Sequence, residues 1–231
     1  MMTDVLASRL PPSVHLCGRM FDSDAVPRWT DWLSPEERAC RAGFGSETRR
    51  HEFLAGRAAA RTVLAAVLDV APPEVPLARA NDGAVDVVGH DWHVSIAHSG
   101  THAVAVCARH AVGVDLEQIQ PRDPALRRFL FAPHLRAVPD ALPYDANTAL
   151  LLCWTLKEAV LKARRSGFRT SPKDLRLDVD ARAHTATVQV TGGDAWTVLF
   201  ERLDDFWCAV ALPRSGSRGG RGEGKRAPQA S

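Results

Sequence analysis

The chain has 231 residues, of which 45% are hydrophobic and 24% charged, an ordinary mixture for a soluble globular protein of one large domain or two small ones. No stretch approaches the roughly 18 apolar residues of a membrane-spanning helix, and no signal peptide opens the chain, so we expect a cytoplasmic protein without a membrane partner. The five cysteines are scattered and form no C-x-x-C pair, which argues against a disulfide framework and a thiolate zinc site.

The first half of the chain predicts a strand, two helices and a hairpin. The segment "SVHLCG" at 13–18 is typical of a strand. A helix begins after Ser34, because Glu37 follows it by three residues and completes a capping box. A second helical pattern covers 48–70 and stops at a pair of prolines. Between residues 76 and 119, short apolar runs around the turn signal "SGT" predict a hairpin that leads into a third strand.

The second half repeats this mixture. After Pro121 the pattern becomes helical, loosens, and resumes strongly from Asn147 to Arg165. The chain then returns to strands with alternating apolar and polar residues, at 176–179, 185–190, 195–201 and 206–212. Each half therefore offers strand, helix and hairpin in similar proportion, although we find no strict sequence repeat. We predict an α+β protein of two similar-sized halves.

Residues 213–231 are expected to form a disordered basic tail. They carry five Lys/Arg and one Glu, so the tail contributes +4 to a net charge of +2 and leaves the remainder near −2. The composition of this segment offers almost nothing to bury. Because the basic residues concentrate in the tail without an aromatic-basic motif, we expect no nucleic-acid partner.

Two groups of charged residues stand out in the second half. Asp115 and Glu117 lie two apart in a strand-like stretch, which alone is typical of a solvated strand end. Trp154, Glu158 and Lys162 are spaced by four, so a helix places them on one face. A Glu-to-Lys pair at this spacing is a common feature of helix surfaces, and only the combination of the two groups favours a functional site.

Together, "SIAHSG" at 95–100, "GVDLE" at 113–117 and "WTLKEAVLKA" at 154–163 resemble the 4′-phosphopantetheinyl transferases. The chain is similar to the monomeric, two-lobed type that activates surfactin synthetase, up to about residue 212. The resemblance implies two pseudo-symmetric lobes with the active site between them. A first lobe, 1–112, would contact coenzyme A, and a second, 113–212, would carry the metal and catalytic residues.

The implied reaction transfers the 4′-phosphopantetheine of coenzyme A to a serine of an acidic acyl or peptidyl carrier protein, with 3′,5′-adenosine bisphosphate as the second product. By resemblance, Asp115, Glu117 and Glu158 hold a metal ion. Mg²⁺ fits because it takes oxygen ligands and uses a few carboxylates together with substrate phosphates. Glu158 is the first candidate for the base that removes the serine proton, with Glu117 as the alternative. Lys162, protonated at neutral pH, would act on the reacting phosphate.

The coenzyme contacts that the resemblance implies come from both halves. His98 matches a histidine that contacts a coenzyme phosphate and joins the catalytic set, and Arg57 matches the arginine near the 3′-phosphate. The full set expected at the coenzyme is Arg50, Arg57, His98, Ser99, Lys157 and Lys162. Arg50 and Arg61 are weaker candidates than Arg57, since solvated helix arginines explain them equally well.

The family pattern fails at three places. Ala97 stands where a serine is common, "GAV" at 83–85 replaces the usual Gly-Lys-Pro, and a glutamate expected after the metal strand is replaced near His134. A non-catalytic carrier-protein-binding module would explain these losses. A metal-dependent phosphohydrolase acting on coenzyme A is a further alternative, since it could use the same three carboxylates.

Overall fold

The computed structural model describes residues 3–80, 82–166 and 169–214. In these ranges no helix is long and apolar enough to cross a bilayer. The helices are α1 (Asp4–Arg9), α2 (Val26–Asp31), α3 (Pro35–Ala42), α4 (Glu47–Leu68), α5 (Ala125–Leu130) and α6 (Ala146–Ala163). Short 3-10 turns are η1 (Ser23–Ala25), η2 (Pro72–Glu74), η3 (Pro133–Leu135), η4 (Val138–Ala141) and η6 (Pro172–Asp174). Beyond Arg214 the expected basic tail lies outside the described residues.

In the described part of the chain, ten strands form two antiparallel sheets. The first sheet contains β1 (Val14–Met20), β2 (Leu77–Arg79), β3 (Val85–Val87), β4 (His93–Ser99) and β5 (His102–Ala108). The second contains β6 (Gly113–Gln118), β7 (Leu175–Asp180), β8 (Thr185–Val190), β9 (Ala195–Leu203) and β10 (Phe206–Pro213). The third strand of the predicted run, β6, does not extend the β4–β5 hairpin by pairing but pairs with β10, so it begins the second sheet.

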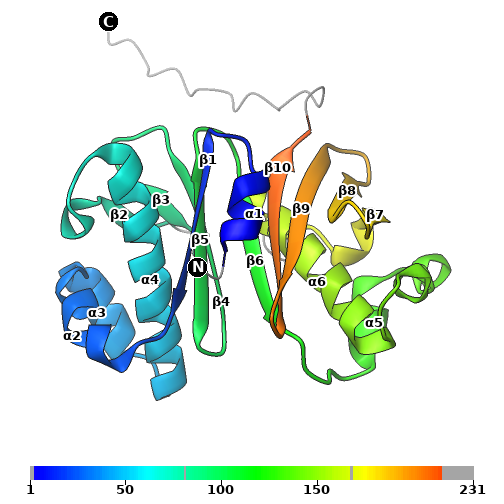
Figure 1. The fold of residues 1–231 in the computed structure, drawn as a ribbon, viewed down its shortest axis with the longest axis horizontal. Coiled ribbons are helices and arrows are strands. Elements are labelled where there is room, and N and C mark those ends of the chain that lie inside the picture. The colour runs from blue at the N-terminus through cyan, green and yellow to red at the C-terminus, as the bar shows by residue number, and fades with distance from the viewer. Residues whose placement is uncertain (1–2, 81, 167–168, 215–231) are drawn as a thin grey trace, which may run out of the picture.

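The two sheets have the same topology. Their strand orders are β1-β5-β4-β3-β2 and β6-β10-β9-β8-β7, and in each lobe a long helix follows the first strand. Helix α4 therefore corresponds to α6 (Figure 1). This confirms the predicted α+β fold in two pseudo-symmetric lobes, although the repeat is one of topology and not of sequence.

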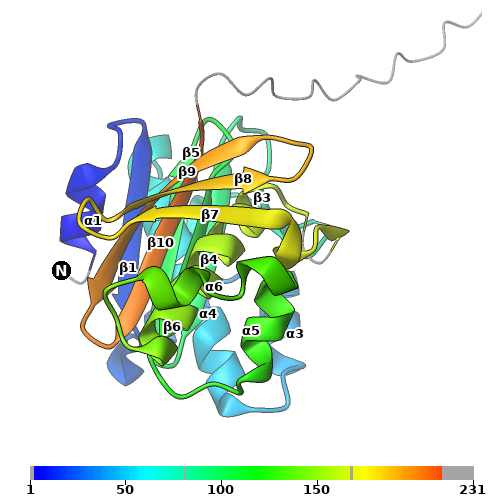
Figure 2. The ribbon, with the colours of Figure 1, turned by 90° about the vertical axis from the view of Figure 1, so that its right-hand side faces the viewer.

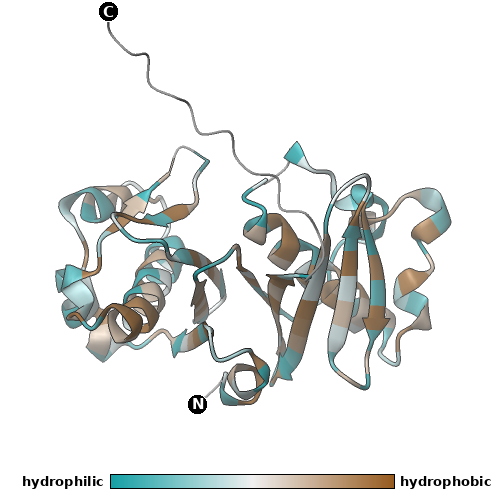
Figure 3. Ribbon diagram, turned by 90° about the horizontal axis from the view of Figure 1, so that it is seen from above, coloured by the Kyte–Doolittle hydropathy of each residue, from teal (hydrophilic) through white to brown (hydrophobic). Residues whose placement is uncertain are grey.

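Side chains alternate between two layers along the central strands. Val104 and Val106 of β5 face an apolar cluster shared with the second sheet, whereas Ala105 packs beneath α4. On β10, Val210 enters the same shared cluster, whereas Trp207 packs with the core under α6. The order of layers is therefore α4, first sheet, second sheet, α6, and hydrophobic segments concentrate in the central strands (Figures 1 and 3). An apolar core thus joins the lobes.

Two serine hydroxyls also join the lobes. The backbone N–H of Val114 donates to Ser95 Oγ at 3.1 Å, and that of Gln118 donates to Ser99 Oγ at 3.0 Å. These bonds hold β4 beside β6 without sheet pairing between them. The register of the inter-lobe boundary is consequently fixed on the side where the charged residues lie.

Helix α1 belongs to the boundary between the lobes and was not predicted. Leu6 and Leu10 are buried in the shared apolar cluster. Arg9 reaches the second lobe, where its guanidinium donates to the carbonyl oxygens of Phe200 and Ala183. The helix lies between β1 and the β9–β10 hairpin (Figures 1 and 2). The first residues of the chain therefore fasten the second lobe to the first.

Candidate active site

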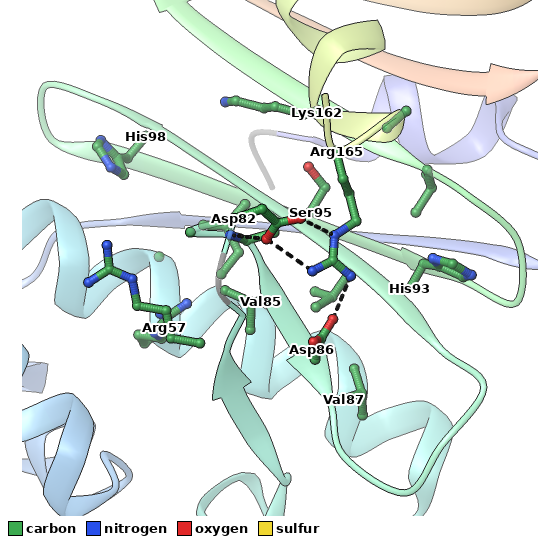
Figure 4. A pocket seen from close by; sticks show the side chains of 18 of the residues that line it. Arg57, Asp82, Val85, Asp86, Val87, His93, Ser95, His98, Lys162 and Arg165 are labelled. Atoms are coloured by element: carbon green, nitrogen blue, oxygen red, sulfur yellow. Dashed lines mark hydrogen bonds and ion pairs between the residues drawn. The ribbon is translucent and has the colours of Figure 1, made fainter. Parts of the chain in front are cut away.

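A pocket of about 760 Å³ opens between the lobes. Its walls are one face of α4, the β2–β3 hairpin, β4 and the C-terminal half of α6. Positive charge comes from both lobes, since Arg49, Arg57 and Arg79 line it from one side and Lys162 and Arg165 from the other (Figure 4). Such a cavity, polar and rich in arginine, suits a ligand that carries several phosphates.

Gly113 brings β6 into close contact with α6. A Cβ at this position would lie 2.0 Å from the carbonyl oxygen of Ala159 and 2.4 Å from the backbone nitrogen of Ala163. No side chain fits there, so the glycine is required by the approach of helix to strand. The close packing places the charged residues of β6 directly against those of α6.

Asp115 is buried beside Lys162. The Lys162 ammonium donates to Asp115 Oδ1 at 2.7 Å, while Asp115 Oδ2 is buried and has no hydrogen-bond partner among the described residues. Leu116 turns to the opposite side, into the cluster between the sheets. An acceptor oxygen left without a donor in a buried place costs free energy, and a cation is one partner that would remove this cost.

Glu117 is held at the far end of the same strand. Trp154 Nε1 donates to its Oε1 at 2.7 Å, and an Arg122 N–H donates to Oε2 at 2.8 Å. Burial raises the pKa of Glu117, and the charge of Asp115 raises it further, while the Trp154 bond opposes both effects. Trp154 and Lys162, eight residues apart on α6, thus each engage one carboxylate of β6.

Glu158 lies between these two contacts on α6. Its pKa is raised from 4.5 to about 7, chiefly by burial and then by the charge of Asp115, while Lys162 opposes this rise and Glu117 adds a smaller one. A carboxyl with a pKa near neutrality can accept a proton at physiological pH. Of these three carboxylates, Glu158 is among the described residues that line the pocket, whereas Asp115 and Glu117 are not.

Carboxylate oxygens are the kind of ligand that a hard cation prefers, but the present positions of these three side chains are less suitable for binding one. Their mutual repulsion raises the pKa of Glu158, and Asp115 Oδ2 has no partner. Among the described residues, however, no three His, Cys, Asp or Glu side chains are gathered closely enough to hold a metal ion. The Lys162 ammonium already bonds one carboxylate, and Trp154 and Arg122 hold another.

His98 lies at the pocket edge at the end of β4. Its Nδ1 is 3.5 Å from Glu52 Oε2, and burial lowers its pKa, which the Glu52 charge partly offsets. Of the described residues that line the pocket, the neighbouring Ser99 is not one, and its hydroxyl accepts the Gln118 N–H that joins the lobes. The assignment of Ser99 to the coenzyme stays a prediction. Ser95 lines the pocket and makes the equivalent bond to Val114.

The arginines of α4 divide between the pocket and the neighbouring helix α3. Glu37 lies 3.0 Å from Arg57 Nε and accepts a 2.7 Å bond from Arg61. Arg57 lines the pocket at the edge of this group, whereas Arg61 is buried away from it. Arg50 forms an ion pair with Glu47 and is not among the described residues that line this pocket, so its assignment as a coenzyme contact stays a prediction.

Lys157 lies in the interior of the second lobe. Its side chain is completely buried, and its ammonium donates to the carbonyl oxygens of Leu130 at 2.7 Å and Pro172 at 2.8 Å. The Phe131 ring lies 4.2 Å from the same nitrogen, and burial lowers the lysine pKa to about 8. Lys157 faces the side of α6 away from the pocket, so it fastens loops of the second lobe and contacts no coenzyme here.

Comparison with known proteins assigns the family. The profile of the 4′-phosphopantetheinyl transferase superfamily matches residues 111–211, and the profile of the 4′-phosphopantetheinyl transferase N-terminal domain matches residues 37–108. The chain belongs to the 4′-phosphopantetheinyl transferase superfamily. The two matched segments fall on the two lobes, and together they cover most of the chain.

Relatives from three organisms support this assignment. A phosphopantetheinyl transferase of Thraustochytrium sp. is 29% identical over 81% of this chain and 72% of its own length. The 4′-phosphopantetheinyl transferase HetI of Nostoc sp. is 29% identical over 80% of this chain and 79% of its own length. The 4′-phosphopantetheinyl transferase gsp of Aneurinibacillus migulanus is also 29% identical, over 58% of this chain and 57% of its own length.

The pocket also contains residues that the sequence patterns do not single out. Arg49 and Glu52 lie on the pocket face of α4, and the helical period that the sequence does show would have grouped them with Gly56. Asp82 and Arg165 are ion-paired across the lobes at the place where the usual Gly-Lys-Pro is missing. No sequence signal joins these two, because they are 83 residues apart.

Proposed function

We propose that this member of the superfamily transfers the 4′-phosphopantetheine group of coenzyme A to a serine of a carrier protein, and that it does so in the pocket between its lobes. The observation that carries the proposal is the junction of Asp115, Lys162 and Glu158 at the edge of an arginine-lined cavity. A second lobe that supplies carboxylates and a lysine, facing a first lobe that supplies arginines, matches a reaction on a polyphosphate.

The reaction follows from these positions. The carrier serine oxygen attacks the β-phosphorus of coenzyme A, and the bond from that phosphorus to the oxygen shared with the α-phosphorus breaks. 3′,5′-Adenosine bisphosphate leaves with this oxygen. Glu158 accepts the serine proton on its carboxylate, since burial raises its pKa to about 7. The Lys162 ammonium stabilises the charge that develops on the leaving phosphate, and such transfers depend on positioning and charge neutralisation.

A divalent cation, for which Mg²⁺ is our proposal, would be held by Asp115, Glu158 and Glu117 and would neutralise pyrophosphate charge. Support comes from the buried Asp115 Oδ2 without a partner and from the repulsion that raises the pKa of Glu158. The Lys162 ammonium bonds the other oxygen of Asp115, so the ion and the lysine would lie side by side at this carboxylate.

The remaining parts of the proposal concern the substrates. Arg57 and His98 would bind the phosphates at the first-lobe side, where both line the pocket. The carrier protein would be acidic, and the exposed Phe129 next to Trp154, with Arg122 nearby on Glu117, would suit such a partner. The chain would act as a monomer, because residues of one copy from both lobes line the pocket. The non-catalytic and phosphohydrolase alternatives gain no support from the comparisons.

Mass spectrometry tests the transfer. Apo-carrier proteins of acyl and peptidyl type are incubated with the enzyme, coenzyme A and Mg²⁺, and the mass of the carrier is followed. Gain of one phosphopantetheine on the carrier supports the proposal. Release of pantetheine phosphate without a carrier would instead indicate a hydrolase, and carrier binding without any mass gain would indicate a non-catalytic module.

A further inference from the structure

Helix α6 ends in a motif that normally uses glycine. The N–H of Ser166 donates to the carbonyl of Leu161, and that of Arg165 donates to the carbonyl of Lys162, which is the Schellman pattern. Arg165 has φ of 51°, the left-handed conformation that is unfavourable for a residue with a Cβ. An arginine at this position directs its side chain off the end of the helix and into the pocket (Figure 4).

The Arg165 side chain reaches from the second lobe to the first. Arg165 Nε and one terminal nitrogen lie 3.0 and 3.1 Å from the two oxygens of Asp82, and the other terminal nitrogen lies 2.5 Å from Asp86 Oδ1 (Figure 4). All three residues line the pocket. Their side chains are between 27% and 48% exposed. Ion pairs with this exposure are weak, because solvent screens them, so an anion that binds the guanidinium more strongly can replace them.

A polyphosphate in this pocket would meet two carboxylates on the β2–β3 hairpin, where the family pattern has a lysine. Asp82 and Asp86 would repel it unless their charge were compensated. A guanidinium offers a planar pair of donors that matches phosphate oxygens, and its bonds to phosphate are stronger than exposed ion pairs.

We propose that Arg165 binds the pyrophosphate of coenzyme A in this pocket. Without coenzyme A, Asp82 and Asp86 hold the Arg165 side chain in place, and the pyrophosphate replaces them when it binds. Arg165 follows Lys162 by three residues, so it stands on the side of the reacting phosphates. Arg57 lies across the pocket (Figure 4). The inference rests on the proposed function, because it takes coenzyme A as the occupant. Arg165 thereby supplies the cation that the missing Gly-Lys-Pro lysine does not.

Calorimetric titration with coenzyme A and with 3′-dephospho-coenzyme A tests this assignment. Arg165→Ala should weaken the binding of both ligands about tenfold or more, because both contain the pyrophosphate. The double variant Asp82→Asn/Asp86→Asn should bind both more tightly than the native protein, by about threefold or more, since the competing carboxylates are gone. Arg164→Ala is the matched control, because the neighbouring Arg164 pairs with Asp194 outside the pocket.

The directions in which the two variants change the affinity distinguish a phosphate-binding residue from one that only holds the lobes together. If the ion pairs only hold the lobes together, removal of either side should weaken binding in the same direction, and that result would overturn the proposal. Binding by Arg165→Ala equal to that of Arg164→Ala would overturn it as well. Arg165→Lys keeps a charge and replaces Arg165→Ala if that variant does not fold. A native protein that binds neither ligand would refute the proposed function and this inference with it.

Discussion

Replacement of Glu158 by glutamine should stabilise the metal-free protein at pH 8 and abolish transfer. Burial and the nearby carboxylates raise the Glu158 pKa from 4.5 to about 7 in the folded chain. Between these pH values the folded state keeps a proton that the unfolded state has lost, so stability falls as pH rises through this window. By pH 8 the whole penalty is present, and a neutral glutamine does not carry it.

The size of the effect follows from the shift. A rise of about 2.5 in pKa corresponds to roughly 3.4 kcal/mol at about 1.36 kcal/mol for each unit. Glu158 is only partly buried, so solvent screening reduces this ceiling to about 1–2 kcal/mol. For a chain of this length such a gain raises the melting temperature by about 2–8 °C.

Thermal melts in EDTA at pH 5 and pH 8 measure this difference. The variant should gain stability at pH 8 and gain little at pH 5. An equal change at both pH values would refute the electrostatic reasoning. Transfer by Glu158→Gln, followed as carrier mass, should fall about 10²-fold or more, and activity within a few-fold of native would remove Glu158 from the base role.

Three further predictions address the rest of the site. Gly113→Ala should cost more than about 3 kcal/mol in urea unfolding, because its Cβ would lie 2.0 Å from the Ala159 carbonyl oxygen; unchanged stability would show that the helix can move away. Asp115→Ala should stay folded yet lose both transfer and the rise in melting temperature that Mg²⁺ gives the native protein, and activity that persists in EDTA would contradict the metal proposal. Lys162→Ala should lower kcat about 10²-fold or more, whereas Arg57→Ala should chiefly raise KM for coenzyme A and remove the preference for coenzyme A over 3′-dephospho-coenzyme A. Arg57→Ala with its preference intact would exclude it as the 3′-phosphate contact.

Sequence alone predicts the features that depend on near neighbours in the chain. The capping box of Ser34 and Glu37 is present as expected, and α6 presents Trp154 and Lys162 on the face that meets β6. Leu116 turns into the core, as the strand period of two requires. These results need only the helical and strand periods, which the pattern of residues shows directly.

The expectations from sequence and the observed positions differ where distant segments decide which way a side chain faces. Arg50 carries the same charge as Arg57, but Arg57 lines the pocket beside Glu37 of α3, whereas Arg50 pairs with Glu47 of its own helix. Lys157 adjoins Glu158 in the family motif, yet loop carbonyls of Leu130 and Pro172 surround its ammonium. The helical period alone predicts neither position, since each depends on partners from elsewhere in the fold.

The attachment of α1 affects the order in which this chain can fold during synthesis. Arg9 bonds the carbonyl of Phe200, 191 residues later, and Leu6 is buried among side chains of the last strands. At about 5–20 residues per second, roughly 10–40 s pass before the partner of α1 leaves the ribosome. Throughout that time the apolar face of α1, and the inner face of the first sheet, have no cover and can associate with other chains. The slow step in production of this protein should therefore be closure of the interface between the lobes, and chaperones that bind exposed apolar segments should raise its yield.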